Sequence, residues 1–459
     1  MAEVYYFVSD LHVGGDEQLQ EAEFESEFVA FLERLADRDE DAELIILGDA
    51  FGLWEFTEVE GLAKFDRLVE NHPGLFEQFC ATGERIDITL IPGNHDAELA
   101  GYRAYVDRLA EYNVTLDATL SLERPVAGRT VWIEHGMQHD PNNRMPDFGN
   151  PRANPLGYFV NRHVTSKAGQ LSGHGKYNWL KDIQSMTPLE EIPTWLLSNY
   201  YYREMSPFLR YAALPFLLLF NVSVLYLAIL LLEGSGVLGT TVVTDATTAF
   251  LRLFGLAGDL VAFVFAVNAA VVLLLILISI PLYVLVRDVK RTLERFGISF
   301  EGAAGDRDAA YLDAARDVFA ERPDVAVYVY GHTHRASLTR LDERVVINTG
   351  TWLKRLHRVS PRIGLLPPIY RPSFRLNYFR ISEEAGDVLV EYETVEKEAR
   401  QELSFLQRLL AERRPPAPEI PDRTVVAGSP DDREESAVQE RAADGQSTDA
   451  TSDGDPERD

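Results

Sequence analysis

Five short clusters of aspartate, asparagine and histidine are spread along the chain. Two of them have the form D-x-H or H-x-H, namely Asp10 with His12 and His332 with His334. In an extended backbone, residues two positions apart point to the same side, so both side chains of such a pair can bind one metal ion. The other three clusters are Gly48-Asp49, Gly93-Asn94-His95-Asp96 and His135-Gly136. Together the clusters offer carboxylate, amide and imidazole donors without a thiolate.

This donor set predicts a pair of divalent metal ions. Oxygen and imidazole ligands without thiolate suit manganese, iron or zinc better than a structural zinc site. Two ions about 3.5–4 Å apart can clamp a phosphoryl group, lower the pKa of a bridging water and stabilise the leaving oxygen. We therefore expect two divalent ions, manganese first with iron or zinc as alternatives, and hydrolysis of a phosphate ester or anhydride.

The clusters lie where predicted strands end. Apolar runs of strand length and composition occupy residues 4–8, 43–47, 86–91, 130–133, 325–330 and 344–348. Apolar residues at helical spacing occur in the segments 21–38, 60–79, 96–111 and 305–321. Strands and helices therefore alternate, which predicts an α/β fold. In such folds, ligands bind at the carboxyl ends of the strands.

The five clusters, in their order along the chain, resemble those of the calcineurin-like metallophosphoesterases. The similarity covers most of residues 1–150 and 300–395. It implies a four-layer sandwich of two mixed β-sheets flanked by helices. It also implies one metal bound by Asp10, His12, Asp49 and His334, and a second bound by Asp49, Asn94, His135 and His332, with Asp49 as the bridge. His95 would then be the catalytic residue that faces the scissile phosphate, and Asp96 would orient its imidazole.

Three further motifs are most similar to the branch around UDP-2,3-diacylglucosamine pyrophosphohydrolase, which cleaves a nucleotide-linked lipid at the membrane. They are G-D-x-F at 48–51, H-G-x-Q-x-D at 135–140 and N-T-G-T-W at 348–352. Many family members carry a second acidic residue about three positions after the motif aspartate, whereas this chain has Gly52 there. His139, Asp140 and Asn142 follow a ligand motif closely, and they either take part in the site directly or hydrogen-bond to a ligand.

Two segments, 211–232 and 260–286, carry no charged residue. As helices with a rise of about 1.5 Å per residue they would be roughly 33 and 40 Å long, while the hydrocarbon core of a bilayer is about 30 Å thick. We expect both to span a membrane. Two buried core helices, or a hairpin that enters one leaflet, are the alternatives. A soluble helix of this length normally shows a polar face, which favours spanning.

The orientation of the hairpin follows from its basic flanks and from the metal ligands. Arg203 and Arg210 precede the first segment, and Arg287, Lys290, Arg291 and Arg295 follow the second. The positive-inside rule places both flanks in the cytoplasm and the loop 233–259 outside. Ligands before and after the hairpin must meet in one site, so the number of crossings is even. We expect a two-span protein of the cell membrane with a cytoplasmic catalytic domain and cytoplasmic termini.

These features predict five regions. Residues 1–149 and 291–413 form two parts of one catalytic domain, 150–207 a helical cap, 208–290 the transmembrane hairpin, and 414–459 a disordered acidic tail whose partner is unknown. The tail is rich in Pro, Gly, Ser and acidic residues and can bury little apolar surface. The aromatic residues around the end of the cap are expected to form a belt at the membrane interface, namely Trp195, Tyr200, Tyr201, Tyr202 and Tyr211.

Charge restricts the possible partners. The 459 residues include 44 basic and 72 acidic ones, for a net charge of −28, which disfavours binding to nucleic acid. Basic residues nevertheless concentrate in 141–181 and 344–382, either as structural ion pairs or as a rim for an anionic headgroup or the lipid bilayer. In the second case, segment 353–375 would lie against the bilayer. Its basic residues would be attracted to an anionic leaflet and its apolar residues would insert shallowly; the basic ones are Lys354, Arg355, Arg358, Arg362 and Arg371, and the apolar ones Leu365, Leu366 and Ile369.

The sequence therefore predicts a membrane-anchored, metal-dependent hydrolase that acts on a phosphate ester or pyrophosphate bond, with a lipid-linked or nucleotide-linked substrate. One alternative is a phosphodiesterase or phosphatase on a soluble nucleotide, merely tethered to the membrane. Another is a non-catalytic membrane scaffold with a vestigial site. The complete set of seven candidate ligands argues against the scaffold.

Overall fold

Two mixed β-sheets form the centre of the computed structural model, which describes residues 3–174, 178, 180–186, 191–295, 308–362, 366–397, 403–411 and 419–428. The first sheet has seven strands in the order β14-β13-β12-β1-β2-β3-β4. Strands β1 (Val4–Val8), β2 (Ala42–Leu47), β3 (Asp87–Ile91) and β4 (Thr115–Leu116) are parallel, whereas β12 (Leu376–Glu384), β13 (Asp387–Val395) and β14 (Arg423–Val426) add antiparallel pairs.

The second sheet has five strands in the order β5-β6-β7-β9-β8. Its three central strands are parallel, and its edge strands are antiparallel to their neighbours. The strands are β5 (Ser121–Val126), β6 (Arg129–Glu134), β7 (Val325–Tyr330), β8 (Ser337–Leu341) and β9 (Arg344–Asn348). All six strands expected from the apolar runs are present, which confirms the predicted α/β class with two mixed sheets.

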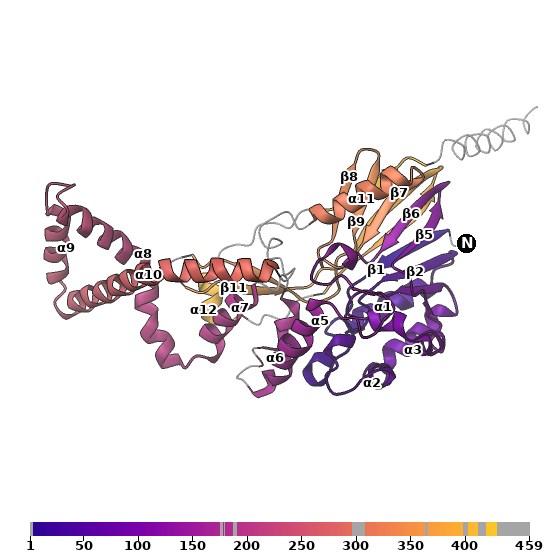
Figure 1. Ribbon diagram of the computed structural model, residues 1–459, viewed down its shortest axis with the longest axis horizontal. Coiled ribbons are helices and arrows are strands. Elements are labelled where there is room, and N and C mark those ends of the chain that lie inside the picture. Colours follow the sequence, from indigo (N-terminus) through magenta and orange to yellow (C-terminus); the bar gives the residue numbers. More distant parts are fainter. Residues whose placement is uncertain are drawn as a thin grey trace, which may run out of the picture.

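Alternation along the strands divides the core into layers. Tyr5 and Phe7 of β1 belong to a cluster between the two sheets, whereas Tyr6 and Val8 belong to a cluster on the outer face of the first sheet. That outer face is covered by helices α1 (Glu25–Ala36) and α3 (Pro73–Gly83), and the outer face of the second sheet is covered by α11 (Ala309–Glu321). Two sheets between two helical layers give the predicted four-layer sandwich (Figure 1).

Two of the predicted helices are interrupted. The segment 60–79 divides into α2 (Leu62–Asn71) and α3, because Pro73 lacks a backbone N–H and instead begins the second helix. The segment 96–111 contains the short 3-10 helix η3 (Ala97–Gly101) followed by α4 (Arg103–Ala110). Three further 3-10 turns are η1 (Glu17–Gln20), η2 (Leu53–Glu55) and η4 (Met137–His139).

The described residues of 150–207 are mostly helical. They form α5 (Leu156–Val160), the π-helical turn η5 (Asn161–Thr165), α6 (Ser166–Gln170), η6 (Leu171–His174), η8 (Lys181–Ser185), α7 (Ile192–Asn199) and the π-helical turn η10 (Tyr200–Glu204). A hairpin of β10 (Arg355–Val359) and β11 (Ile369–Ser373) packs beside them, and α12 (Phe405–Leu410) adds to this contact.

The predicted aromatic belt is wrong for three of its five members. Trp195, Tyr201 and Tyr202 are 1–3% exposed, and they pack against the β10–β11 hairpin and α12. A run of aromatic side chains can pack in a hydrophobic core as well as at a membrane interface, and these three pack in a core. Only Tyr200 and Tyr211 are exposed, at 43% and 61%.

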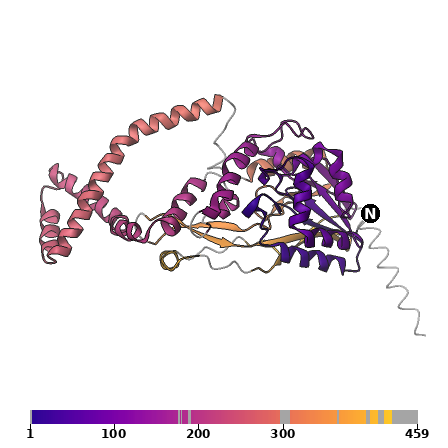
Figure 2. The same cartoon turned by 90° about the horizontal axis from the view of Figure 1, so that it is seen from below.

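Three helices project away from the sheets in both views (Figures 1 and 2). They are α8 (Pro207–Gly234), α9 (Val242–Arg252) and α10 (Leu256–Arg295). Ser206 caps α8 by accepting a hydrogen bond from the N–H of Leu209, and Pro207 occupies its first turn. Helices α8 and α10 contain the predicted spans 211–232 and 260–286, and both are long and apolar enough to cross a membrane. Helix α9 in the loop was not predicted.

The predicted start of the disordered tail, at residue 414, precedes an ordered strand. Residues 423–426 form β14, which pairs with β13 and buries Thr424 and Val426. The open edge of β13 supplies hydrogen-bond partners, so four residues of alternating burial are enough to form an edge strand. Residues 414–418 and 429–459, which make up most of the predicted tail, lie outside the described residues.

Candidate metal centre

The predicted ligands follow the carboxyl ends of parallel strands from both sheets. Asp10, Asp49 and Asn94 follow β1, β2 and β3, while His135 and His332 follow β6 and β7. The loops that follow β2, β3 and β6 pack closely against one another. A Cβ atom added to Gly48 would lie only 2.6 Å from backbone atoms of Gly93 and from Nδ1 of His135. The strand order of the two sheets thus brings together residues more than 300 positions apart.

Five of the seven predicted ligands have a positive backbone φ angle, a conformation that glycine adopts most easily. The φ angles are 54° for Asp10, 47° for His12, 52° for Asp49, 67° for His332 and 57° for His334. Each such residue costs on the order of 1 kcal/mol or more, and this strain persists only where the surrounding structure enforces it. A concentration of such residues is typical of a functional site.

One group of donors contains Asp10, His12, Asp49 and His334, whose ligand atoms all lie within 4.8 Å of one another. His334 Nε2 is 3.2 Å from Oδ1 of Asp10, and the Nε2 atoms of His12 and His334 are 3.1 Å apart. His12 Nε2 is 3.6 Å from Oδ2 of Asp49. These four residues are the predicted ligands of the first metal.

A second group contains Asp49, His135 and His332. His135 Nε2 lies 3.4 Å from Oδ2 of Asp49, 3.2 Å from Oδ1 of Asn94 and 3.3 Å from Nδ1 of His332. The structure therefore brings together all four predicted ligands of the second metal. Asp49 belongs to both groups, as its predicted bridging position requires.

The two groups fit divalent ions. Ligand atoms about 2.1 Å from one ion lie roughly 3.0–3.4 Å apart, which is the spacing of the closest donor pairs here. Oδ1 of Asp10 is buried, and apart from its 3.2 Å ion-pair contact with Nε2 of His334 it accepts no well-aligned hydrogen bond from the described residues. Burial and the nearby His95 lower the pKa of His12 to about 3, so this imidazole is neutral and can offer a lone pair. Either group could hold one ion.

The electrostatics of the site also favour cations. Burial disfavours the ionised form of Asp49, but His135 and His95 hold the pKa of its carboxyl well below its usual range. Burial also lowers the pKa of His135, yet Asp49 and Asp10 raise it overall to about 9. Buried carboxylates that draw protons onto neighbouring imidazoles would be neutralised equally well by divalent ions.

Hydrogen bonds orient two of the predicted ligands, His135 and His332. Nδ1 of His135 donates to the carbonyl oxygen of Leu47 at 2.7 Å, which directs its Nε2 toward Asp49. Nε2 of His332 donates to Oδ2 of Asp140 at 3.0 Å, which directs its Nδ1 toward the site. Burial raises the pKa of Asp140, but His332 lowers it overall to about 2. Asp140 therefore hydrogen-bonds to a ligand, one of its two predicted roles.

His95 is held by a residue that the sequence did not reveal. Its Nδ1 lies 2.9 Å from Oε1 of Glu55, which is 3% exposed. Burial lowers the pKa of His95, but Glu55 and Asp49 raise it overall to about 9. The ring also contacts His12 at 4.4 Å and Trp54 at 4.3 Å between centroids.

The predicted role of Asp96 is therefore wrong. Its carboxylate does not orient the imidazole but accepts hydrogen bonds from the backbone N–H groups of Gly93 at 2.6 Å and of Asp49 and Phe51 at 3.2 Å. Asp96 thus fixes the turns that follow β2 and β3. Glu55 lies six residues after Asp49, three positions beyond Gly52, where the family resemblance places a second acidic residue. The sequence carries no motif that marks Glu55 as the partner of His95.

Lys354, Leu366 and Ile369 of segment 353–375 are buried, so they do not lie on the membrane-facing surface predicted for them. Leu365, also predicted to insert, lies outside the described residues. Lys354 is 6% exposed and forms ion pairs with Glu23 at 2.6 Å and Asp182 at 2.9 Å, and Arg358 pairs with Glu191 at 2.8 Å. Leu366 and Ile369 are buried in the cluster with Tyr201 and Tyr202. The alternative of structural ion pairs holds for Lys354 and Arg358, because the β10–β11 hairpin turns them toward acidic residues of neighbouring elements.

A comparison with protein families bears on the assignment of this site. Residues 4–226 match the model of the calcineurin-like phosphoesterases. The match supports membership of this family. At a general level, the calcineurin-like phosphoesterases are metal-dependent phosphoester hydrolases. The matched region includes Asp10, Asp49 and His135 but ends before His332 and His334, which only the geometry adds to the site.

Two solved structures are similar to the chain at low identity. A single mutant of Vps29 from Entamoeba histolytica is 9% identical, with a TM-score of 0.26, over 85% of this chain and 92% of that chain. Phosphopantetheinyl hydrolase (PptH) from Mycobacterium tuberculosis is 11% identical, with a TM-score of 0.25, over 76% of this chain and 90% of that chain. The comparison with curated proteins finds no match.

Proposed function

We propose that the chain is a membrane-anchored phosphoesterase that hydrolyses a phosphate ester or pyrophosphate bond of a lipid-linked or nucleotide-linked substrate. The observation that carries this proposal is the pair of donor groups that share Asp49, with the imidazole of His95 directly beside them. Two divalent ions, manganese before iron or zinc, would polarise the phosphoryl oxygens and lower the pKa of a water in such a site.

The protein itself contributes orientation and a proton donor. Glu55 fixes the His95 imidazole through Nδ1, which leaves Nε2 to face a bound phosphate. From there it can donate a hydrogen bond to a phosphoryl oxygen or a proton to the leaving oxygen. Asp96 supports this placement indirectly, because it holds the turn from Gly93 that carries His95.

Placement in the cell membrane is supported by the position of the hairpin within the chain. Helices α8 and α10 lie between His135 and His332 in sequence, yet these two rings are 5.2 Å apart between centroids. If α8 and α10 each cross the bilayer, both parts of the catalytic domain lie on the same side, and the basic flanks make that side the cytoplasm.

Turnover of a substrate panel tests the proposal. Detergent-solubilised full-length protein with manganese would be assayed on nucleotide-diphosphate lipids, phospholipids, cyclic nucleotides and simple aryl phosphodiesters. We expect lipid-linked substrates to have the highest kcat/KM. Hydrolysis of none of these compounds, with both metals bound, would contradict the proposal.

A soluble nucleotide is the second candidate substrate. Within the part of the chain that the structure describes, α8, α9 and α10 contribute no residue to the donor groups. Deleting residues 208–290 and closing the gap would leave turnover of a soluble nucleotide intact, but would lower turnover of a lipid presented in vesicles.

A further inference from the structure

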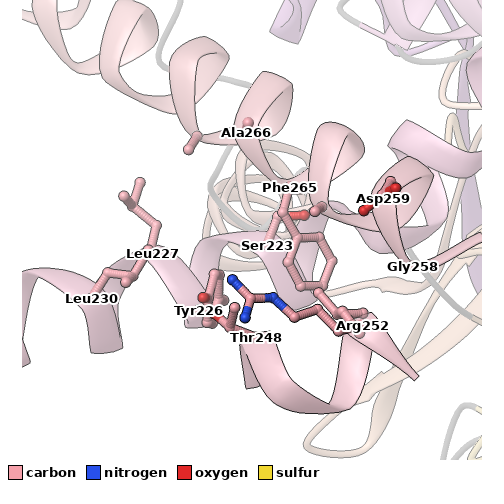
Figure 3. A pocket seen from close by; sticks show the side chains of 13 residues that line it. Ser223, Tyr226, Leu227, Leu230, Thr248, Arg252, Gly258, Asp259, Phe265 and Ala266 are labelled. Carbon is pink, nitrogen blue, oxygen red and sulfur yellow. The ribbon is translucent and has the colours of Figure 1, made fainter. Parts of the chain in front are cut away.

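A cavity of about 320 Å³ lies between α8, α9 and α10 (Figure 3). Helix α9 and the ends of α8 and α10 that meet it lie far from the sheets (Figure 1). Tyr226, Leu227 and Leu230 of α8 and Phe265 and Ala266 of α10 form apolar walls, and Arg252 comes from the end of α9. This volume is at the small end of the range for ligand sites, about 300–1,000 Å³, so it can hold part of a ligand rather than a whole lipid.

Buried polar contacts fix the three helices around the cavity. Asn268 of α10 donates through Nδ2 to Oγ of Ser223 at 3.0 Å and to the carbonyl oxygen of Phe216 at 3.1 Å, which sets α10 against α8. At the other end, the carboxylate of Glu233 accepts the backbone N–H groups of Val243 at 2.9 Å and Thr244 at 3.2 Å. These contacts satisfy the first turn of α9 and hold it beside α8.

Arg252 is the only Lys or Arg between Arg210 and Arg287. The nearby acidic residues have other partners. Glu233 caps α9, and the carboxylate of Asp245 accepts a hydrogen bond from the hydroxyl of Thr241 at 2.8 Å. Asp259 also lines the cavity, but no ion pair joins it to Arg252 among the described residues. Figure 3 shows the guanidinium extending toward Tyr226 and Thr248, while Asp259 lies beyond Phe265. The guanidinium therefore remains available to an external anion.

The surroundings of Arg252 are those of a water–lipid boundary. Phe250, Leu253, Phe254 and Leu256 are 56–87% exposed around the turn from α9 to α10. An amphipathic helix with an apolar exposed side and a cationic residue is typical of a segment that lies in the plane of a membrane interface. A guanidinium at this level faces lipid phosphates, whose oxygens it binds in a bidentate manner.

We propose that this cavity binds one anionic phospholipid. Its phosphate contacts Arg252 at the mouth, and part of one acyl chain lies against Leu227, Leu230 and Phe265. This inference rests on the membrane placement in the proposed function and adds a ligand site distant from the metal centre. The charge of Arg252 distinguishes an anionic lipid from a zwitterionic one, whose own cationic group would lie near the guanidinium.

Lipid retention by the full-length protein tests the site. Protein in detergent would be titrated with phosphatidylglycerol or phosphatidylcholine, and bound lipid would be counted by native mass spectrometry. We expect tighter binding of phosphatidylglycerol. Arg252→Gln weakens it about five- to tenfold, and Arg252→Lys weakens it less. Ala266→Phe fills the apolar part and weakens binding of both lipids.

The matched control is Arg287→Gln, which removes the same charge at the opposite end of the α10 span. It should leave phosphatidylglycerol binding within about twofold. Equal affinity of the wild type for both lipids, or equal losses in Arg252→Gln and Arg287→Gln, would overturn the proposal. Gel filtration and the unfolding temperature without added lipid identify a misfolded variant. If Arg252→Gln is misfolded, the lipid binding of Arg252→Lys and Ala266→Phe tests the site instead. The readout is bound lipid, so its failure is separate from a failure of hydrolysis.

Discussion

The carboxylate of Glu55 and the imidazole of His95 are joined by a 2.9 Å contact between Oε1 and Nδ1. The same Oε1 accepts a hydrogen bond from Nδ2 of Asn161 at 3.1 Å, and Asn161 begins the π-helical turn η5. The position of the imidazole beside the candidate metal centre therefore depends on η2, which carries Glu55, and on η5, which begins 106 residues after Glu55.

Glu55→Gln should lower kcat about 10- to 100-fold and leave metal content unchanged, because the amide has a similar shape but no longer provides a charged acceptor for His95. Metal analysis and steady-state kinetics on an aryl phosphodiester measure the two effects. Glu58→Gln, at an exposed position three residues later, is the matched control and should behave as wild type. A loss of bound metal in Glu55→Gln would show instead that Glu55 is itself a ligand, together with His12 and His95.

Replacing Asp49 should affect both ions. In Asp49→Asn the shared carboxylate charge is lost from both donor groups, so we expect less than about one ion per chain and no measurable turnover. Asp10→Asn removes a carboxylate from one group only and should retain about one ion. Elemental analysis of the purified proteins distinguishes the two variants, and equal metal loss in both would contradict the bridging position of Asp49.

Replacing His95 should separate binding from chemistry. Because its ring lies beside the donor groups but Glu55 occupies its Nδ1, His95→Asn should keep both ions and lower kcat about 10²- to 10⁴-fold, the usual range for a lost proton donor. Metal stoichiometry and single-turnover rates check this. His163→Asn changes an exposed histidine and serves as the control. A parallel loss of metal and rate would make His95 a ligand.

How far the sequence predicts this structure depends on the range of the interactions. The strands and the clustering of the candidate ligands were predictable, because polar clusters such as those at Asp10 and Asp49 directly follow the apolar runs. The partner of His95 was not, because Glu55 lies among apolar residues and meets the ring only through the turn η2. Ile369 was misjudged for a similar reason. A mixture of basic and apolar residues describes both a membrane surface and a hairpin with one buried face.

Asp96 should matter for stability more than for catalysis. Its carboxylate accepts three backbone N–H groups, and an asparagine offers one oxygen and an NH₂ group that cannot accept. We expect Asp96→Asn to cost about 2–3 kcal/mol in the free energy of unfolding, measured by urea denaturation of the metal-free protein. Asp107→Asn, at an exposed position, should change it by less than about 0.5 kcal/mol. A normal unfolding free energy with a large loss of kcat would restore a catalytic role for Asp96.

The topology of the hairpin can be tested with single cysteines, because Cys80 is the only natural one and Cys80→Ser provides the background. Ser235 is exposed in the loop between α8 and α9, and Ala118 is exposed beside β5 in the catalytic domain. If α8 and α10 each cross the bilayer, a membrane-impermeant thiol reagent should label Ser235→Cys in intact cells, and should label Ala118→Cys only after permeabilisation. A hairpin that enters a single leaflet would leave both positions on the cytoplasmic side, so neither would react in intact cells. Labelling of both positions in intact cells would instead place the metal centre outside, against the basic flanks at Arg210 and Arg287.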